Sequence, residues 1–286
     1  MPITGTFAPV PTPLRRNGRL DQPALRRHLE WLHGRDLDGA LILGTNGEFA
    51  SLAMVERSFI ARHAALLKPP GMRLLLNAGS CALPEALKLA DLAWRHRYSA
   101  ILLPPPWYFR GAPVSGVADF VRRVLDHARL PLLLYHIPQL TGVPVSDALL
   151  DAIGPHANLA GVKDSTGDES ELRRLSTRFA GAGYLVGNDR LVAAAYAAGG
   201  SGSITACASV VPDLVAAIPR DAAQQAKLNS VRAILDKFGL NAAVKAVLRR
   251  MGMGEYVARP PLEDLPEQGA KALFGMLDAL GVIEGR

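Results

Sequence analysis

The stretch Leu159-Ala160-Gly161-Val162-Lys163-Asp164-Ser165-Thr166-Gly167-Asp168 has the pattern of a buried strand that runs into polar residues. A lysine stands where this strand should reach the end of a packed sheet. Because a buried ammonium is costly to desolvate, such a lysine is either neutralised by an acid or kept as a free amine. A free amine attacks a ketone and forms a Schiff base. Lys163 is therefore either a nucleophile or a strand-end lysine that reaches solvent and pairs with Asp164, and both interpretations stay open.

Apolar runs of this kind recur about every thirty residues, which is the length of one strand-helix unit. The runs are residues 4–10, 40–43, 73–77, 99–103, 131–135, 159–163, 184–186 and 201–205. Amphipathic stretches lie between them, and the start signals of the expected helices are Asp21, Ser51, Pro84, Ser146 and Asp168. Nearly continuous apolar strands, each followed by a helix, indicate a parallel sheet covered by helices. Eight units in 286 residues favour an α/β fold of the closed (β/α)8 type, a TIM barrel.

An open doubly wound sheet is the alternative fold. Against it, the cluster Gly199-Gly200-Ser201-Gly202 lacks the spacing of a nucleotide-binding loop. Four further helical stretches follow the eighth run from about Val210, with Pro260-Pro261 before the last of them. We therefore expect residues 1–209 to form the barrel and residues 210–286 to form a helical region with a structural role or a subunit contact.

Composition and charge narrow the classes of function. The chain is 49% hydrophobic, and its 32 Lys and Arg against 26 Asp and Glu give a net charge of +6. The arginine pairs are scattered and have no aromatic stripe among them, so we expect no nucleic-acid partner and consider small anionic substrates a better match. The two cysteines, Cys81 and Cys207, have no His or carboxylate at metal-ligand spacing, which favours a cytoplasmic protein without a metal.

Targeting and membrane segments are not expected either. The first residues lack the basic region and apolar stretch of a signal peptide. The run of residues 191–212 carries no charge, yet it is rich in Gly, Ser and Thr. It is typical of a helix, a turn and a buried strand rather than of a membrane span.

The catalytic groups of a (β/α)8 barrel stand at the carboxyl ends of its strands. Polar residues follow the apolar runs in Gly44-Thr45-Asn46-Gly47-Glu48, Pro106-Trp107-Tyr108, Tyr135-His136, Lys163-Asp164 and Gly187-Asn188-Asp189. Thr45 and the backbone N–H groups after it are suited to hold a carboxylate. Tyr135 either exchanges a proton with the reacting oxygen or is a core phenol with a satisfied hydroxyl. Strand alternation turns His136 to the other side, so we interpret it as a packing or interface histidine.

In order and spacing these motifs resemble the dihydrodipicolinate synthase and N-acetylneuraminate lyase superfamily. The resemblance rests on Gly44-Thr45-Asn46-Gly47-Glu48, Tyr135-His136-Ile137-Pro138, Gly161-Val162-Lys163-Asp164 and the terminal helices, and it covers nearly the whole chain. It implies a (β/α)8 barrel with a C-terminal helical region, usually a tetramer built as a pair of dimers. It also implies a Schiff base between pyruvate and Lys163, with no metal and no organic cofactor.

The resemblance further implies roles for individual residues. Tyr135 would be the acid and base at the bound keto acid, with Thr45 and Tyr108 completing the proton relay. Tyr108 would reach the site of a neighbouring subunit. The residues that would bind the substrate are Thr45 and Asn46 at the pyruvate carboxylate, Gly187 and Ile204 beside the imine, and Asp189 at substrate hydroxyls.

Two departures from the pattern bear on the substrate. Leu140 stands where dihydrodipicolinate synthases carry an arginine that grips the carboxylate of the aldehyde, and leucine there resembles the sugar-acid aldolases. Arg190 stands where the neuraminate lyases have Glu, so sialic acid fits poorly. Lys-Asp-Ser-Thr-Gly-Asp at residues 163–168 is similar to the segment found in 2-keto-3-deoxy sugar-acid and 4-hydroxy-2-oxoglutarate aldolases.

We therefore expect a class I lyase that reversibly cleaves a 4-hydroxy-2-oxo acid, either a 2-keto-3-deoxy sugar acid or 4-hydroxy-2-oxoglutarate, to pyruvate and an aldehyde. Three alternatives stay open: a 2-keto-3-deoxy sugar-acid dehydratase, a synthase-like condensation of pyruvate with an aldehyde, and a keto-acid-binding protein without turnover. Arg190 either recognises a distal carboxylate, which would favour 4-hydroxy-2-oxoglutarate, or is a surface arginine at a helix start.

Overall fold

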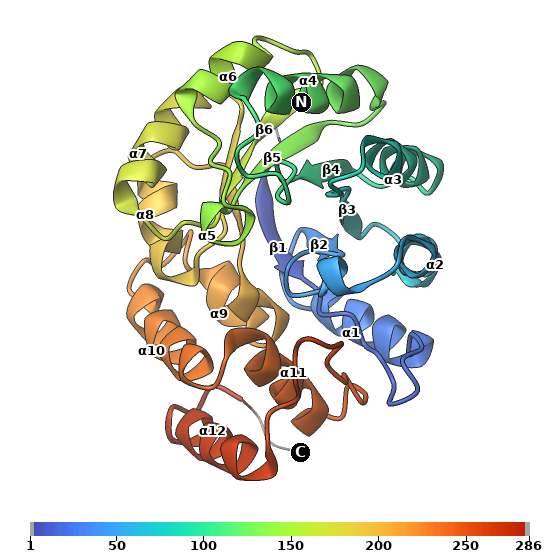
Figure 1. The fold of residues 1–286 in the computed structure, drawn as a ribbon. Coiled ribbons are helices and arrows are strands. Elements are labelled where there is room, and N and C mark those ends of the chain that lie inside the picture. Colours follow the sequence, from blue (N-terminus) through green and yellow to red (C-terminus); the bar gives the residue numbers. More distant parts are fainter. Residues whose placement is uncertain (1–2, 284–286) are drawn as a thin grey trace. The chain divides into compact units, whose positions relative to one another are not determined.

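The computed structural model describes residues 3–283, in which strands and helices alternate along the chain (Figure 1). The strands are parallel and follow one another in the order β1 to β8 of a closed barrel, which confirms the predicted fold class. They are β1 (Gly5–Pro9), β2 (Gly39–Ile42), β3 (Arg73–Asn77), β4 (Ala100–Leu103), β5 (Leu132–His136), β6 (Leu159–Asp164), β7 (Gly183–Val186) and β8 (Gly202–Ile204). Two compact units share them: unit 1 is Arg73–Ser203 with the residues up to Gly5, and unit 2 is Thr6–Met72 with the residues from Ile204 onward.

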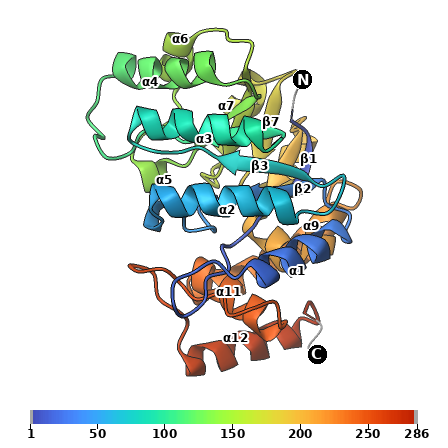
Figure 2. The ribbon, with the colours of Figure 1, turned by 90° about the vertical axis from the view of Figure 1, so that its right-hand side faces the viewer.

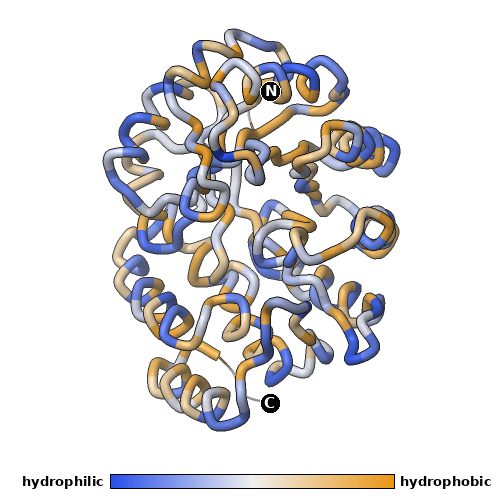
Figure 3. The backbone as a smooth tube through the Cα atoms, viewed as in Figure 1, coloured by the Kyte–Doolittle hydropathy of each residue, from blue (hydrophilic) through white to orange (hydrophobic). Residues whose placement is uncertain are grey.

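Unit 1 contains the continuous parallel pairing from β3 to β8. Its helices are α3 (Leu83–Arg95), α4 (Val114–His127), α5 (Pro138–Thr141), α6 (Asp147–Ile153), α7 (Glu169–Arg178) and α8 (Val192–Ala197), with a 3-10 turn at Asp189–Leu191. Helix α3 contacts β3 and β4 and lies beside α4, which in turn contacts α6 (Figure 2). Seen nearly end-on, α3 is hydrophobic on the side toward the strands and hydrophilic on the other side (Figure 3). The apolar face of the helix is therefore removed from water by the sheet.

Unit 2 contains the pairing of β1 with β2, in which Phe7 lies beside Gly39 and Pro9 beside Leu41. Its helices are α1 (Gln22–His33), α2 (Met54–Leu67), α9 (Pro212–Ala217), α10 (Gln224–Lys237), α11 (Leu240–Arg250) and α12 (Glu267–Ala279), with 3-10 turns at Phe49–Ser51 and Ala206–Ser209. The helices α9 to α12 match the predicted helical stretches after the eighth strand. The predicted boundary between residues 209 and 210 stays a prediction.

Most helix starts agree with the expected capping signals. The side chains of Asp21, Ser146 and Asp168 accept hydrogen bonds from backbone N–H groups at the starts of α1, α6 and α7. The start expected at Ser51 is wrong, because Phe49–Ser51 forms a 3-10 turn and α2 begins at Met54. Glu56 fixes that start, since its carboxylate accepts a hydrogen bond of 2.9 Å from the N–H of Ala53.

The uncharged run of residues 191–212 forms helix α8, strand β8 and a 3-10 turn, as its composition indicates. Within residues 3–283, no helix combines the length and the apolar character needed to cross a bilayer.

A β-bulge in β6 sets the register of the strands that carry the expected catalytic residues. Leu132 pairs with Leu159, but the next residue of β5, Leu133, pairs with Gly161, so Ala160 is an additional residue on β6. Tyr135 consequently pairs with Lys163. Without the additional residue the register would shift by one position, and Tyr135 would pair with Val162. A shift of one residue also turns the side chains of the strand to the opposite face.

Gly161 is the residue that permits this bulge. Its φ is +153°, and a Cβ added to it would lie 1.9 Å from the carbonyl oxygen of Gly183 on β7. Backbone atoms cannot move aside as a flexible side chain can, so only glycine fits at the bulge.

Replacing Gly161 with Ala should lower the free energy of unfolding by more than about 3 kcal/mol, because the new methyl group meets backbone and forces a register change. Gly116→Ala in α4 is the matched control, since its Cβ would meet only Pro113 at 3.6 Å. It should be neutral or stabilising by up to about 1 kcal/mol. Urea unfolding followed by circular dichroism measures both, and equal stability of the two variants would contradict this role of Gly161.

Candidate functional site

Lys163 lies near the carboxyl end of β6 and is only 3% exposed. Its Nζ atom is 4.1 Å from the centroid of the Tyr135 ring, the residue with which it pairs across the sheet. Within residues 3–283 its amine forms no hydrogen bond and no ion pair. An amine that is buried without a counter-charge is typical of nucleophilic rather than structural lysines.

Asp164, the other possible partner of Lys163, is committed to different groups. Its carboxylate accepts hydrogen bonds from the N–H of Thr166 at 2.9 Å, the hydroxyl of Thr166 at 2.7 Å and the phenol of Tyr184 at 3.0 Å. Burial, followed by the charge of Asp164, raises the pKa of Tyr184, so Tyr184 stays a hydrogen-bond donor. The interpretation of Lys163 as the ion-pair partner of Asp164 is therefore wrong, because adjacent strand residues point to opposite faces.

Ser165 lies in the group around Lys163, although it is not among the residues predicted from the sequence. Its hydroxyl lies 3.5 Å from the hydroxyl of the buried Tyr135, and its carbonyl accepts a hydrogen bond of 2.7 Å from the Gln139 side chain. The signal that points to Ser165 is its position two residues after Lys163, which places both residues on the same side of the chain.

Gly187 follows β7, and its lack of a side chain lets Ser165 and Lys163 lie close to its backbone. A Cβ at this position would lie 1.9 Å from the Ser165 hydroxyl and 2.9 Å from Lys163 Cε. Any side chain here would displace these two groups. The structure thus brings together three of the predicted residues of unit 1, which are Lys163, Tyr135 and Gly187.

The other predicted residues of unit 1 follow β7, where Asp189 and Arg190 lie, and β4, where Tyr108 lies. Asp189 is fully buried in the 3-10 turn after β7, whereas Arg190 is exposed and its backbone N–H is bound by the Asn188 side chain at 3.0 Å. Tyr108 is 76% exposed, and its ring packs edge-on against Phe109 with the centroids 5.1 Å apart. Tyr108 and Arg190 are therefore surface residues of the single chain.

His136 is a packing histidine, as strand alternation indicates. Its Nδ1 accepts a hydrogen bond of 3.0 Å from the N–H of Val145, so Nε2 carries the proton and donates to Glu171 at 2.8 Å. Burial lowers the pKa of His136, although the carboxylates of Asp164 and Glu171 oppose this shift. Arg174 in turn holds Glu171 at 2.7 Å. The imidazole is therefore neutral and anchors the loop that follows β5.

In unit 2 the predicted residues lie on the loop after β2 and on β8. Thr45 is half-buried, while Ile204 is buried in β8. Asn46 is 9% exposed, and its Nδ2 has no hydrogen-bond partner among the described residues. A buried amide donor without a partner is costly, so Asn46 is suited to bind an acceptor such as a carboxylate.

Glu48 holds this loop in place through a buried ion pair. Its carboxylate lies 2.7 Å from the ammonium of Lys245 on α11 and accepts a hydrogen bond of 3.0 Å from the N–H of Arg259. Lys245 also donates to the carbonyl of Val257 at 2.9 Å. Burial lowers the pKa of Lys245, and Glu48 opposes this shift. This pair was not predictable from the sequence, because no local pattern connects two residues so far apart in the chain.

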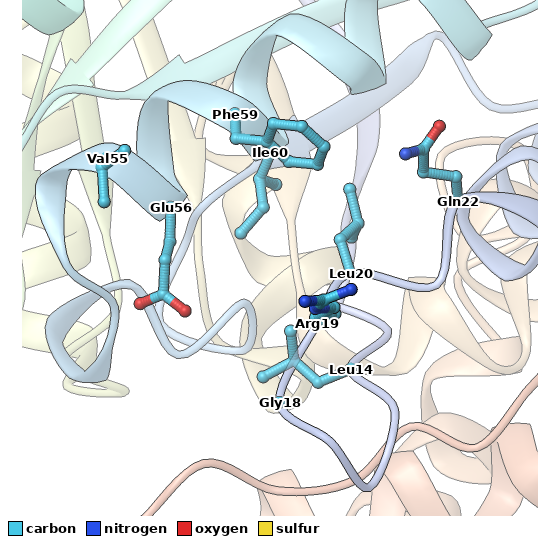
Figure 4. Close-up of a pocket in the computed structure, with 9 residues that line it drawn as sticks. All are labelled: Leu14, Gly18, Arg19, Leu20, Gln22, Val55, Glu56, Phe59 and Ile60. Atoms are coloured by element: carbon cyan, nitrogen blue, oxygen red, sulfur yellow. The ribbon is translucent and has the colours of Figure 1, made fainter.

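Unit 2 also contains a pocket of about 490 Å³, which Figure 4 shows between the loop before α1 and helix α2. Apolar side chains, including Leu14, Leu20 and Ile60, line most of it, and none of the predicted site residues does. The pocket is therefore separate from the predicted site residues of this unit. Among residues 3–283 there is no cluster of three His, Cys, Asp or Glu side chains that fits a metal ion.

Sequence comparison identifies relatives along the whole chain. The model of the dihydrodipicolinate synthetase family matches residues 2–280. An uncharacterized DapA-like lyase from Chloroflexus aurantiacus is 32% identical over 286 residues, with 94% of each chain covered. A 4-hydroxy-tetrahydrodipicolinate synthase from an Azoarcus species is 31% identical, with 93% of this chain and 94% of the relative covered. A probable 2-dehydro-3-deoxy-D-pentonate aldolase from Escherichia coli is 26% identical, with 98% of each covered.

Solved structures share the same fold. A dihydrodipicolinate synthase from Acinetobacter baumannii, complexed with pyruvate, matches with a TM-score of 0.90 and 26% identity over 98% of this chain and 100% of the other. The E. coli protein YagE in complex with pyruvate matches with a TM-score of 0.92 and 24% identity over 98% and 99% of the two chains. The second likeness shows the fold alone.

The buried ion pair of unit 2 gives a stability prediction. Glu48→Gln should lower the free energy of unfolding by about 3–5 kcal/mol, because Lys245 is left buried without a counter-charge. Glu267→Gln removes the exposed pair with Lys271 and should change it by less than about 0.5 kcal/mol. Adding Lys245→Met to Glu48→Gln should recover most of the loss. Urea titrations of the four proteins measure these values, and a small effect of Glu48→Gln would show that the pair contributes little.

Proposed function

Because the chain belongs to the dihydrodipicolinate synthetase family, we propose that it is a Schiff-base-forming lyase that reversibly cleaves a 4-hydroxy-2-oxo acid to pyruvate and an aldehyde. The observation that carries this proposal is the Lys163 amine, which is buried against the ring of Tyr135 without a counter-charge. A protein that only binds keto acids does not need such an amine, since hydrogen-bond donors suffice for binding.

The proposed reaction begins when the free amine of Lys163 attacks the C2 carbonyl of the substrate. Loss of water gives an iminium ion, which withdraws electrons from C3. Tyr135 removes the proton of the C4 hydroxyl, the C3–C4 bond breaks, and its electron pair moves into the iminium to form an enamine. The aldehyde leaves, C3 takes up a proton, and hydrolysis of the imine releases pyruvate and restores the amine.

Substrate binding follows from the polar groups at the strand ends. Thr45 and Asn46 bind the carboxylate of the keto acid, which is supported by the unpartnered amide donor of Asn46. Gly187 and Ile204 line the imine, and the absence of a side chain at Gly187 lets Lys163 lie close to its backbone. Asp189 binds hydroxyl groups of the substrate, and Tyr108 completes the proton relay with Thr45 and Tyr135.

The proposal includes a homo-oligomer, a tetramer built as a pair of dimers, in the cytoplasm. Its support is the exposure of Tyr108 and Phe109, two adjacent aromatic rings that are costly to leave in water. In such an assembly Tyr108 reaches the site of a neighbouring subunit. Pyruvate and a small aldehyde are the partners of this reaction, which uses no organic cofactor.

A coupled assay with lactate dehydrogenase tests the proposal by following pyruvate release from 4-hydroxy-2-oxoglutarate and from 2-keto-3-deoxy sugar acids. The unaltered protein should release pyruvate, and Lys163→Ala should lower kcat by more than about a thousandfold, because the covalent route is lost. Lys88→Ala, at an exposed lysine on α3, is the control and should keep full activity.

Analysis of the products separates the alternatives. A longer oxo acid in place of pyruvate would identify a dehydratase, and net condensation of pyruvate with an aldehyde would identify a synthase. Pyruvate release that survives in Lys163→Ala would contradict the Schiff-base mechanism.

A further inference from the structure

Arg110 is a charged residue of unit 1 that has no role in the reaction proposed above. It follows Tyr108 and Phe109 on the loop between β4 and α4, and it is exposed. In the part of the chain that the structure describes, its guanidinium has no hydrogen bond, no ion pair and no aromatic partner. All five of its N–H donors are therefore open to a ligand.

Gly142, directly after α5, determines where the Arg110 side chain lies. A Cβ on Gly142 would be 2.5 Å from Arg110 Cδ and 2.8 Å from its Nε, and the φ of Gly142 is +68°. The aliphatic part of the Arg110 side chain thus packs against the backbone of Gly142. Only glycine both adopts this φ readily and leaves room for this part of the side chain.

Helix α5 connects this position to the catalytic residues. Gln139 on α5 donates a hydrogen bond of 2.7 Å to the carbonyl of Ser165, whose hydroxyl is 3.5 Å from that of Tyr135. Tyr135 is the partner of Lys163 across the sheet. The Arg110 side chain therefore lies against the end of α5, the helix that Gln139 connects to Ser165 beside Tyr135.

The other side chains of α5 offer no free donor for an anion. Gln139 is engaged with Ser165, and the hydroxyl of Thr141 donates within its own turn, to the carbonyls of Ile137 or Val143. Leu140 is 56% exposed and has no polar atom. The positive charge at this turn comes from Arg110.

We propose that Arg110 binds a carboxylate on the aldehyde half of the substrate. This inference rests on the proposed function and specifies its substrate class: 4-hydroxy-2-oxo acids with a second carboxylate, rather than those that end in a neutral chain. A guanidinium forms two parallel hydrogen bonds to a carboxylate, which makes it selective for this group over a hydroxyl. In this assignment Arg110, and not Arg190, is the arginine that recognises the distal charge.

The test compares aldehydes of equal length with and without a carboxylate in the condensation with pyruvate. Glyoxylate is paired with acetaldehyde, and succinic semialdehyde with butanal. The measured quantity is the ratio of kcat/KM for the acidic aldehyde to kcat/KM for the neutral one. The proteins are the unaltered chain, Arg110→Gln, Arg110→Lys, Arg190→Gln and, as a matched control, Arg122→Gln at an exposed position of α4.

We expect the unaltered protein to favour an acidic aldehyde and Arg110→Gln to lower this ratio by about 10- to 100-fold, the value of a charge-assisted hydrogen-bond pair. Arg110→Lys should recover part of it, while Arg190→Gln and Arg122→Gln should leave the ratio unchanged. Trapping of pyruvate with borohydride should be equal in all five proteins.

Equal losses on acidic and neutral aldehydes in Arg110→Gln would indicate a structural role and overturn the proposal. A ratio that falls in Arg190→Gln instead, or no preference in the unaltered protein, would overturn it as well. In these cases pyruvate trapping would still succeed and the proposed function would stand. Failure of trapping in the unaltered protein would overturn both.

Discussion

The β-bulge at Ala160 and Gly161 is the constraint on which the arrangement around Lys163 depends. Parallel strands align their side chains by register, and the single additional residue in β6 sets Lys163 rather than Val162 beside Tyr135. The bulge is possible because Gly161 adopts a positive φ and has no Cβ that would clash with the carbonyl of Gly183. The absence of a side chain at Gly161 thus determines that Lys163 lies beside Tyr135.

Among residues 3–283, the two buried lysines differ in how their charges are neutralised. Lys245 is 0% exposed and is neutralised by Glu48 at 2.7 Å, as expected of a structural charge. Lys163 is almost as deeply buried, yet its neighbour Asp164 points away from it and binds Thr166 and Tyr184. A buried lysine of this chain is thus neutralised by a carboxylate at Lys245 but not at Lys163. This contrast supports a chemical rather than a structural role for that amine.

The pattern of apolar runs predicted all eight strands within about two residues, because burial on both faces of a parallel sheet leaves a continuous apolar signal. It also indicated Lys163 and Tyr135, and the family resemblance added Gly187, which lies beside Lys163 in the structure. The bulge was not predictable, since Ala160 is as apolar as its neighbours and the register depends on the adjacent strands. The ion pair of Glu48 with Lys245 and the position of Arg110 over Gly142 were missed for a related reason: both are contacts between segments far apart in the sequence. The predicted start of α2 at Ser51 was wrong, because α2 begins at Met54 and the Glu56 side chain accepts a hydrogen bond from the N–H of Ala53 just before it.

The proposed mechanism requires the amine of Lys163 to be the nucleophile. The most direct measurement is a mass spectrum of the protein after incubation with pyruvate and borohydride, followed by peptide mapping of the adduct and the same treatment of Lys163→Ala. We expect one reduced pyruvyl group per chain, located on Lys163 and absent from the variant. An adduct on another residue, or no adduct in either protein, would contradict it.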